Sequence, residues 1–217
     1  MWRSNTMIFR ATDFLARRAA IAALALAASL VAPMVAQAAQ SADQIAAHFS
    51  SVRTMMGEFV QFGPRGEQTG GKFYIERPGK IRFDYEAPSG FRVTSDGSSV
   101  VIMNKKLNTA DLYPLSKTPL KLLLDERIDL SGDKVQTVRE DDDLTTIKMS
   151  DKSVFGNSTI TMMFDSASYD LRQWTITDAQ GKDTTVMIFN VQQGVTFDPS
   201  VFEIDYRRVD KMSRNKR

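Results

Sequence analysis

The chain has 217 residues, with 28 Lys and Arg, 26 Asp and Glu, one His and no Cys, and 42% of its residues are hydrophobic. Without cysteine it cannot form a disulfide, a thiolate nucleophile or a cysteine-based zinc or iron–sulfur site, and one His cannot build a histidine-rich metal cage. The balanced charge and the hydrophobic content exclude a disordered, collagen-like or strongly nucleic-acid-binding protein, so the length predicts one domain or two small ones.

The first 38 residues differ in composition from the rest and resemble a secretory signal peptide. Four arginines, the last of them Arg18, precede an apolar run over 19–35, and the small-x-small sequence of 36–38 follows. The run is short for a membrane-spanning helix, so we expect a cleaved signal peptide at 1–38 rather than an uncleaved anchor. Cleavage leaves 24 basic and 25 acidic residues, so the mature protein is nearly neutral.

An amphipathic helix is predicted next. Ser41 and Gln44 have the spacing of a capping box, and Ile45 and Phe49 continue at helical spacing. His48 lies on this helix. Because no neighbour in the sequence completes a catalytic triad, we interpret His48 as a lone surface or lid histidine rather than a catalytic residue.

Hydrophobic and polar residues alternate through most of the remaining chain, which predicts β-strands with one buried face. Turn-forming pairs such as Gly70-Gly71 and Asp96-Gly97 recur at the spacing of antiparallel hairpins, without β–α alternation. We therefore expect one antiparallel sheet in a single domain, 39–205. Its predicted strands lie near 57–62, 71–77, 80–86, 91–95, 99–104, 109–113, 134–140, 144–150, 158–165, 170–178, 183–191 and 201–205.

One short apolar helix interrupts the predicted strands. Thr118-Pro119 predicts its start, and Leu120 to about Arg127 places leucines on several of its sides. A long sheet that is dry on one face needs a cover, and two short helices provide little material for it. Either the sheet closes into a packed barrel, or an apolar concavity is left partly unfilled for another molecule.

Three charged segments are interpreted as solvent-facing. The acidic run 140–143 lacks the glycine and the spaced oxygens of a calcium loop, so it is expected to top a hairpin. Asp84 and Glu86 alternate toward the polar face of a strand, which favours solubility over a catalytic acid pair. The basic segment 206–217 is expected to be a disordered tail, with contact to anionic lipid or an acidic partner as its alternative role.

The sequence GKFYIERPGKIRFDYEAP, from Gly71 to Pro88, resembles the signature hairpin of the periplasmic outer-membrane lipoprotein carrier (LolA) family. Weaker matches at 57–61, 93–97, 118–120 and 202–205 extend the similarity over about Ser41 to Asp205. The resemblance implies a mainly β fold, namely an unclosed (half) antiparallel β-barrel of about eleven strands with a short α-helical lid. Its hydrophobic cavity would take the acyl chains of lipoproteins.

The resemblance also implies a function in the periplasm of a Gram-negative bacterium. A chaperone of this family binds lipoproteins released by an inner-membrane lipoprotein-releasing ABC transporter and delivers them to an outer-membrane lipoprotein receptor. Acylated lipoproteins, the transporter and the receptor are therefore the expected partners. We expect a monomer that binds no nucleic acid, cofactor or metal. Because no Cys follows the signal peptide, the chain is not itself the lipid-anchored receptor.

Arg77 departs from the apolar pattern of its strand. Strand parity places it on the same side as Phe73 and Ile75. In the family, the arginine of this Arg-Pro motif bonds the helical lid and holds the empty cavity shut, so the resemblance implies the role of a lid latch for Arg77. A strand-end arginine that extends to water before the turn is the alternative. Pro78 ends the strand, because proline cannot continue the ladder.

The predicted lipid-binding residues are the inward-facing apolar residues of the strands and of the lid. On the sheet they are Phe59, Phe73, Ile75, Ile81, Phe83, Tyr85, Val93, Phe164 and Trp174, and on the lid they are Leu120, Leu123 and Leu124. For each residue alone, ordinary core packing is the alternative interpretation.

Two other functions stay open at this stage. A half-barrel of the same fold can serve as a lipid- or lipoprotein-sensing module, although such a protein usually carries an extra domain. A periplasmic hydrolase would need a carboxylic acid of raised pKa in a polar cleft, and no candidate pair of carboxylates faces inward. We therefore expect a carrier and not an enzyme.

Overall fold

A computed structural model describes residues 32–129, 134–150 and 156–215, with only the backbone described over 32–41. Contacts divide the chain into two units, Met1–Gln40 and Ser41–Arg217. Helix α2 spans Ala32–Ser51, so the predicted helix start at Ser41 is wrong. The alanine-rich sequence before Ser41 has high helix propensity, which the capping-box pattern did not take into account. None of the described helices combines the length and the apolar character needed to cross a membrane.

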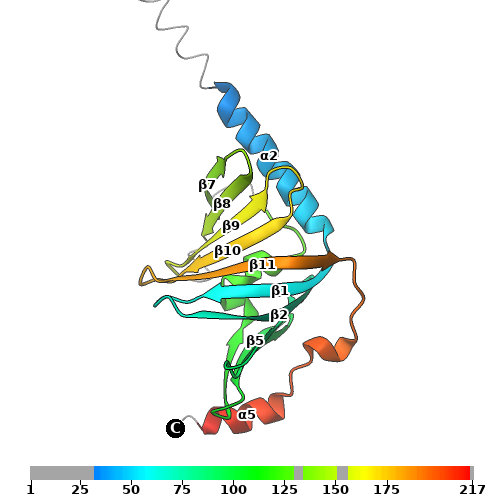
Figure 1. Ribbon diagram of the computed structural model, residues 1–217, viewed down its shortest axis with the longest axis vertical. Coiled ribbons are helices and arrows are strands. Elements are labelled where there is room, and N and C mark those ends of the chain that lie inside the picture. Colours follow the sequence, from blue (N-terminus) through cyan, green and yellow to red (C-terminus); the bar gives the residue numbers. More distant parts are fainter. Residues whose placement is uncertain (1–31, 130–133, 151–155, 216–217) are drawn as a thin grey trace, which may run out of the picture. The chain divides into compact units, whose positions relative to one another are not determined.

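Eleven antiparallel strands form one sheet among the described residues (Figure 1). They are β1 (Thr54–Phe62), β2 (Gln68–Glu76), β3 (Lys80–Tyr85), β4 (Phe91–Asp96), β5 (Ser99–Asn104), β6 (Thr109–Pro114), β7 (Val135–Glu140), β8 (Leu144–Ser150), β9 (Thr159–Asp165), β10 (Leu171–Thr177) and β11 (Asp183–Gln193). Their order is β6-β5-β4-β3-β2-β1-β11-β10-β9-β8-β7, and in the described strands the edges β6 and β7 do not pair. The predicted fold, an unclosed antiparallel half-barrel with a helical lid, is confirmed.

Two strand predictions need correction. The predicted strand 201–205 is wrong: Pro199–Phe202 forms a 3-10 helix, η3, in which the Asp198 side chain accepts a hydrogen bond from the Ser200 N–H. Strand β1 begins at Thr54 rather than at 57, because a β-bulge near Gly57 lets the ladder continue. A Cβ at Gly57 would lie 2.8 Å from the carbonyl oxygen of Phe189, so the bulge requires glycine.

The main hydrophobic core lies on the concave face of the sheet, where residues from both halves meet helix α2. Ile45 and Phe49 of α2 are 0% and 1% exposed. Phe49 packs edge-on against Phe164 of β9, with ring centroids 5.3 Å apart. The helix therefore fills one part of the concavity with the protein's own side chains.

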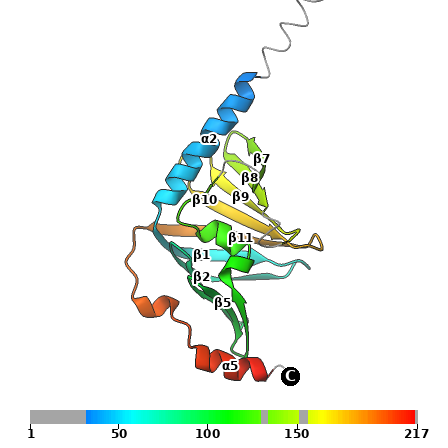
Figure 2. The ribbon, with the colours of Figure 1, turned by 180° about the vertical axis from the view of Figure 1, so that it is seen from behind.

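The segment 115–128, called the lid below, covers the concave face between the two halves of the sheet (Figure 2). It contains the 3-10 helix η1 (Leu115–Lys117) and helix α3 (Leu120–Leu124). Helix α3 is shorter than the predicted 120–127, because Asp125 takes an extended conformation with ψ of 153°. Leu122, Leu123 and Leu124 are buried.

The C-terminal segment corrects the prediction of a disordered tail, because helix α5 spans Tyr206–Arg214. The side chain of Asp205 caps the helix by accepting a hydrogen bond from the Arg208 N–H at 3.0 Å. A second, smaller apolar cluster on the convex face buries Val209 and Met212 of α5 against strands β5 and β6. Residues 216 and 217 lie outside the described part of the chain.

Helix α5 also covers the β6 edge of the sheet. The Ser213 hydroxyl donates to the carbonyl oxygen of Ala110 at 2.9 Å, and the Asn215 amide donates to that of Asn108 at 3.2 Å. Through Ser213 the helix occupies a backbone acceptor of β6 that an edge strand would otherwise leave open, and through Asn215 it binds the β5–β6 turn.

We predict that Phe164→Ala lowers the free energy of unfolding by about 3–5 kcal/mol, because it removes a fully buried ring from a packed core. Chemical denaturation of the two proteins measures the difference. Phe189→Ala is the matched control: its ring is 42% exposed, so a loss of about 0.5 kcal/mol or less is expected. Equal losses in the two variants would contradict this placement of the core.

Candidate functional site

The part of the concave face that α2 does not fill holds a cavity of about 460 Å³, called the acyl cavity below after the ligand that the sequence analysis predicts for this face. This volume falls within the range of about 300–1,000 Å³ that is typical of ligand pockets. The lining comes from eight strands, the β1–β2 turn and the start of the lid: Gln61, Glu67, Thr69, Phe83, Tyr85, Phe91, Val93, Val100, Ile102, Tyr113, Thr118, Pro119, Leu120, Trp174, Ile176, Thr184 and Val186. The cavity is therefore mostly apolar and aromatic.

The few polar groups of the acyl cavity are engaged or lie at its rim. The Tyr85 hydroxyl donates to Gln61 Oε1 at 2.6 Å, and burial raises the pKa of Tyr85 to about 12. Glu67 is the one carboxylate among the described lining residues. The backbone N–H groups of Glu67 and Arg65 hold the pKa of this exposed carboxyl below its ordinary value. The described lining has no pair of groups for acid–base catalysis near neutral pH.

Five of the twelve predicted lipid-binding residues line this cavity: Phe83, Tyr85, Val93, Leu120 and Trp174. The other seven are packed in the core at 1% exposure or less, and these are Phe59, Phe73, Ile75, Ile81, Phe164, Leu123 and Leu124. The structure thus places all twelve on the concave side and divides them between an open and a filled region. Which of them contact a ligand stays a prediction.

The sequence analysis missed several lining residues that strand pairing brings into place. Val93 of β4 pairs with Ile102 of β5, and both side chains line the cavity. Trp174 of β10 pairs with Val186 of β11 in the same way. The alternation of residues within β5 and β11 indicates which side chains share a face. Which of the two faces points into the concavity depends on the strand register, which the sequence alone does not show.

Arg77 follows the last residue of β2 and is 4% exposed. Its Nη1 donates to the carbonyl oxygens of Phe49, at 2.8 Å, and Val52, at the end of α2. Its Nε donates to the carbonyl oxygen of Leu123 in the lid at 3.3 Å. The guanidinium also lies over the Phe49 ring, 3.8 Å from its centroid. One side chain therefore joins β2, α2 and the lid.

The backbone of the same turn adds a further bond to the lid. The Gly79 N–H donates to the carbonyl oxygen of Leu124 at 2.8 Å. Gly79 has a φ of +81°, and a Cβ there would lie 2.7 Å from the Cα of Gly97, so the turn requires glycine. Arg77 and Gly79 together bind the last two carbonyl groups of α3, which a helix of five residues cannot satisfy itself.

The burial of Arg77 is only partly compensated. Its Nη2 has no hydrogen-bond partner among the described residues. Burial lowers the pKa of Arg77 to about 10, so the group stays charged at neutral pH. A buried cation with unused donors costs free energy, which means that the closed arrangement is held less firmly than three hydrogen bonds alone would suggest.

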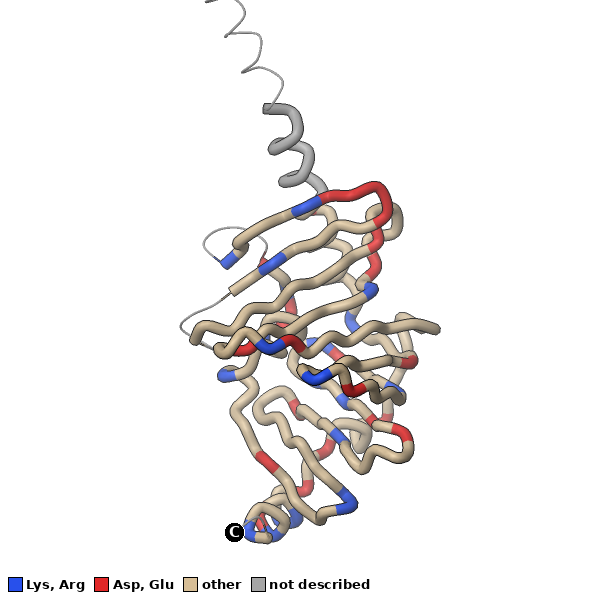
Figure 3. Tube along the Cα trace, turned by 60° about the vertical axis from the view of Figure 1, so that its left-hand side comes forward, with Lys and Arg blue, Asp and Glu red and all other residues tan. Residues whose placement is uncertain are grey.

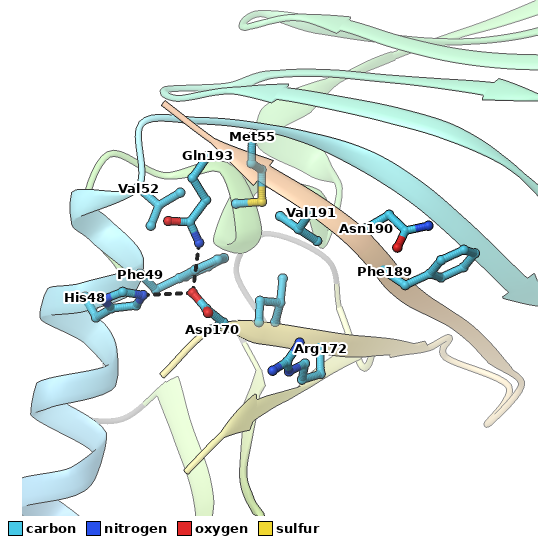
Figure 4. Close-up of a pocket in the computed structure, with 11 residues that line it drawn as sticks. His48, Phe49, Val52, Met55, Asp170, Arg172, Phe189, Asn190, Val191 and Gln193 are labelled. Atoms are coloured by element: carbon cyan, nitrogen blue, oxygen red, sulfur yellow. Dashed lines mark hydrogen bonds and ion pairs between the residues drawn. The ribbon is translucent and has the colours of Figure 1, made fainter. Parts of the chain in front are cut away.

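A second cavity, of about 330 Å³, lies between α2 and the strands β10 and β11 and is called the polar pocket (Figure 4). Asp170 Oδ1 lies 3.0 Å from His48 Nε2 and accepts a hydrogen bond from Gln193 Nε2 at 2.8 Å. Burial raises the pKa of Asp170, but the hydrogen bonds from His48 and Gln193 outweigh it and hold that pKa below its ordinary value of 3.8.

The polar pocket fastens α2 to the sheet rather than forming a reactive centre. His48 is paired with Asp170, so it is not the lone surface or lid histidine that the sequence predicted. The described residues that line the pocket include no Ser, Thr, Cys or Lys that could act as a nucleophile. In the described part of the chain, no group of three or more His, Asp or Glu residues could hold a metal ion.

The sequence matches the family profile described as "Outer membrane lipoprotein carrier protein LolA" over residues 50–205. Two proteins named outer-membrane lipoprotein carrier protein are among the similar sequences. The one from Chromobacterium violaceum is 29% identical over 191 residues, which cover 84% of this chain and 90% of that protein. The one from Methylococcus capsulatus is 26% identical over 170 residues, which cover 74% and 81%.

Solved structures show a weaker likeness. A DUF1329 family protein from Desulfovibrio piger has a TM-score of 0.47 at 12% identity and covers 79% of this chain and 98% of its own. A LolA superfamily protein from Nitrosomonas europaea has a TM-score of 0.43 at 9% identity and covers 76% and 98%.

We predict that Asp170→Asn lowers the melting temperature by a few degrees at neutral pH, because it weakens the bonds from His48 and Gln193 to the residue that precedes β10. The pKa of Asp170 is lower in the folded state than its ordinary value of 3.8. The carboxylate therefore contributes fully to the stability of the fold above pH 3.8, and this contribution is lost as the pH falls through the lowered pKa. Thermal unfolding of both proteins between neutral and acidic pH tests this. The difference should shrink below pH 3.8, and a constant difference down to strongly acidic pH would contradict it. Asp142→Asn, at an exposed residue, is the control and should leave the melting temperature unchanged.

Proposed function

The chain belongs to the outer-membrane lipoprotein carrier (LolA) family, and on this premise we propose that it carries lipoproteins by enclosing their acyl chains. The observation that supports the proposal most strongly is the acyl cavity, an apolar space of about 460 Å³ beneath a lid that one buried arginine fastens. Burying a lipid anchor is worth about 0.8 kcal/mol per methylene group, so the chains need an enclosed apolar site to cross water.

In this proposal the structure is the closed, empty state of the carrier. The acyl cavity is small, because Ile45, Phe49 and the lid leucines occupy the rest of the concavity. Incoming acyl chains would displace these side chains and move the lid away from the turn at Arg77. The protein's own residues and the cargo would then compete for the same apolar surface.

This competition sets the affinity. A ligand that must open a closed state binds more weakly by the free energy of closing. Arg77 supplies part of that free energy of closing through its bonds to Phe49, Val52 and Leu123. Its buried Nη2, which has no partner among the described residues, reduces the free energy of closing. Weakened net binding favours release of the cargo to an acceptor that binds it more tightly.

The wider setting is proposed on the same basis. The protein would act in the periplasm of a Gram-negative bacterium after cleavage of residues 1–38. It would receive lipoproteins from an inner-membrane ABC transporter and pass them to an outer-membrane receptor, without catalysis. The alternative is a sensing module that binds free lipid in the same cavity, and the first experiment below separates the two.

We predict that mass spectrometry of the protein purified from periplasm finds intact acylated lipoprotein bound to it. Val93→Trp should reduce the bound lipoprotein about 10-fold or more, because an indole would fill much of the acyl cavity that Val93 lines. Val60→Trp is the matched control, since Val60 pairs with Met187 on the opposite, convex face of the sheet. Recovery of free lipid without lipoprotein would contradict carriage and favour sensing.

We predict that Arg77→Leu leaves acyl binding intact but lowers transfer of lipoprotein to the acceptor. Loss of the charge-assisted bonds weakens closing, so net affinity for the cargo should rise by about 10-fold. A transfer assay with lipoprotein-loaded carrier and outer-membrane vesicles measures the release. Arg172→Leu, which removes a half-exposed arginine of β10, is the control and should transfer normally. Unchanged transfer in Arg77→Leu would remove Arg77 from the mechanism.

A further inference from the structure

Helix α5 presents a continuous basic stripe to solvent. Arg207, Lys211 and Arg214 recur at i, i+4 and i+7, so they lie on one side of the helix, and all three are exposed. The opposite side carries Val209 and Met212, which are buried against the sheet. The apolar face of the helix is therefore already in use, and its basic face is directed outward. Figure 3 shows Lys and Arg positions along this helix near the C-terminus.

The β5–β6 turn adds a second basic element beside the helix. It carries Lys105, Lys106 and Leu107, and the Leu107 side chain is 70% exposed, the largest value among the exposed large hydrophobic residues. The hydrogen bond from Asn215 to the carbonyl oxygen of Asn108 places this turn at the C-terminal end of α5. A projecting leucine is thus flanked by cations from two segments that are about a hundred residues apart in the sequence.

The cations of the two segments are close enough to influence each other. Burial lowers the pKa of Lys105, and repulsion from Arg92, Arg82 and Arg208 lowers it further. Asp84 acts on Lys105 in the opposite direction and raises its pKa, but this carboxylate is engaged by ion pairs with Arg82 and Arg92. Within the described residues, Arg207, Arg208 and Lys211 take part in no ion pair, whereas Arg214 pairs with Asp210.

We propose that α5 and the β5–β6 turn form a docking surface for membranes that contain anionic phospholipids, with Leu107 entering the interface between lipid headgroups. The surface lies on the convex side of the sheet and at its β6 edge, apart from the acyl cavity. It therefore does not depend on what the cavity binds.

The chemistry of the surface favours lipid over an acidic protein. An isolated, projecting leucine requires a matching pocket in a protein partner, whereas the headgroup region of a bilayer accommodates it without one. Several Lys and Arg residues held at one surface are attracted to anionic lipid additively. Because the apolar face of α5 is packed on the protein, the helix cannot insert, so the contact is shallow, sensitive to salt and reversible.

The experiment is co-sedimentation of the protein purified from periplasm with vesicles of phosphatidylcholine that contain about 30% phosphatidylglycerol, and with vesicles of phosphatidylcholine alone. Binding to the anionic vesicles is expected at about 0.05 M salt and should be largely lost at about 0.5 M salt, where the Debye length is much shorter. No binding to the neutral vesicles is expected. Failure to sediment with anionic vesicles at low salt would overturn the proposal. That result would favour an acidic protein as the partner of this surface instead.

Charge-matched variants separate this surface from net charge. Arg207→Gln/Lys211→Gln/Arg214→Gln should lower the partition coefficient about 10- to 100-fold, because each cation near an anionic surface contributes independently. The control Arg65→Gln/Arg139→Gln/Lys182→Gln removes three exposed cations from other turns and strands and should lower it by about twofold or less. Equal losses in both triple variants would overturn the assignment of the surface.

Two further readouts complete the test. Leu107→Asn should weaken vesicle binding about 3- to 10-fold while leaving the salt dependence unchanged, and no effect would remove Leu107 from the interface. Every variant should retain the melting temperature of the wild type, because the replaced side chains are exposed. Binding of an acyl probe, measured in parallel, should be the same in all variants. Loss of vesicle binding with intact acyl binding distinguishes this surface from the acyl cavity.

Discussion

The arrangement of this protein depends on one buried cation. Arg77 is charged and almost fully enclosed, and a charge in that position is tolerable only with acceptors around it. The acceptors are carbonyl groups at the end of α2 and in the lid. These two segments are far apart in the sequence, and neither is a strand of the sheet. The guanidinium therefore ties both segments to the same end of β2 on the concave face. It holds them by polar bonds to backbone atoms, which can be exchanged for bonds to water when the segments move.

The same constraint explains why the concave face is divided. At the Arg77 end, the rings of Phe49 and Phe164 pack edge-on with their centroids 5.3 Å apart, so the protein's own side chains cover the apolar surface there. At the other end, around Tyr85 and Trp174, the start of the lid borders the space without filling it, and a cavity remains. An unclosed sheet can change its curvature more easily than a closed barrel, because no ladder joins its two edges. Filled and open regions are thus parts of one apolar surface whose boundary can shift.

The sequence predicted much of this and failed at identifiable points. Period-two alternation located the strands, since most of them bury one face, and the parity of Arg77 placed it inward. The strand expected at 201–205 was wrong because Pro199 and the Asp198 cap favour a turn of helix over a ladder. Helix α5 was missed because charge dominates its composition, while its two buried residues, Val209 and Met212, find partners only in the tertiary structure. The extent of the cavity depends on how β4, β5, β10 and β11 face each other, which is a property of register and curvature.

The bonds from α5 to strand β6 bear on how the protein behaves at high concentration. Edge strands can recruit strands of neighbouring molecules, and a half-barrel with eleven strands has two such edges. Ser213 occupies an acceptor on one of them, Asn215 binds the turn that precedes it, and the Val209 and Met212 side chains cover apolar residues beside it. A sheet that extends through many molecules requires two unpaired edge strands in each molecule. The last turn of α5 therefore protects one edge of the sheet against fibre formation.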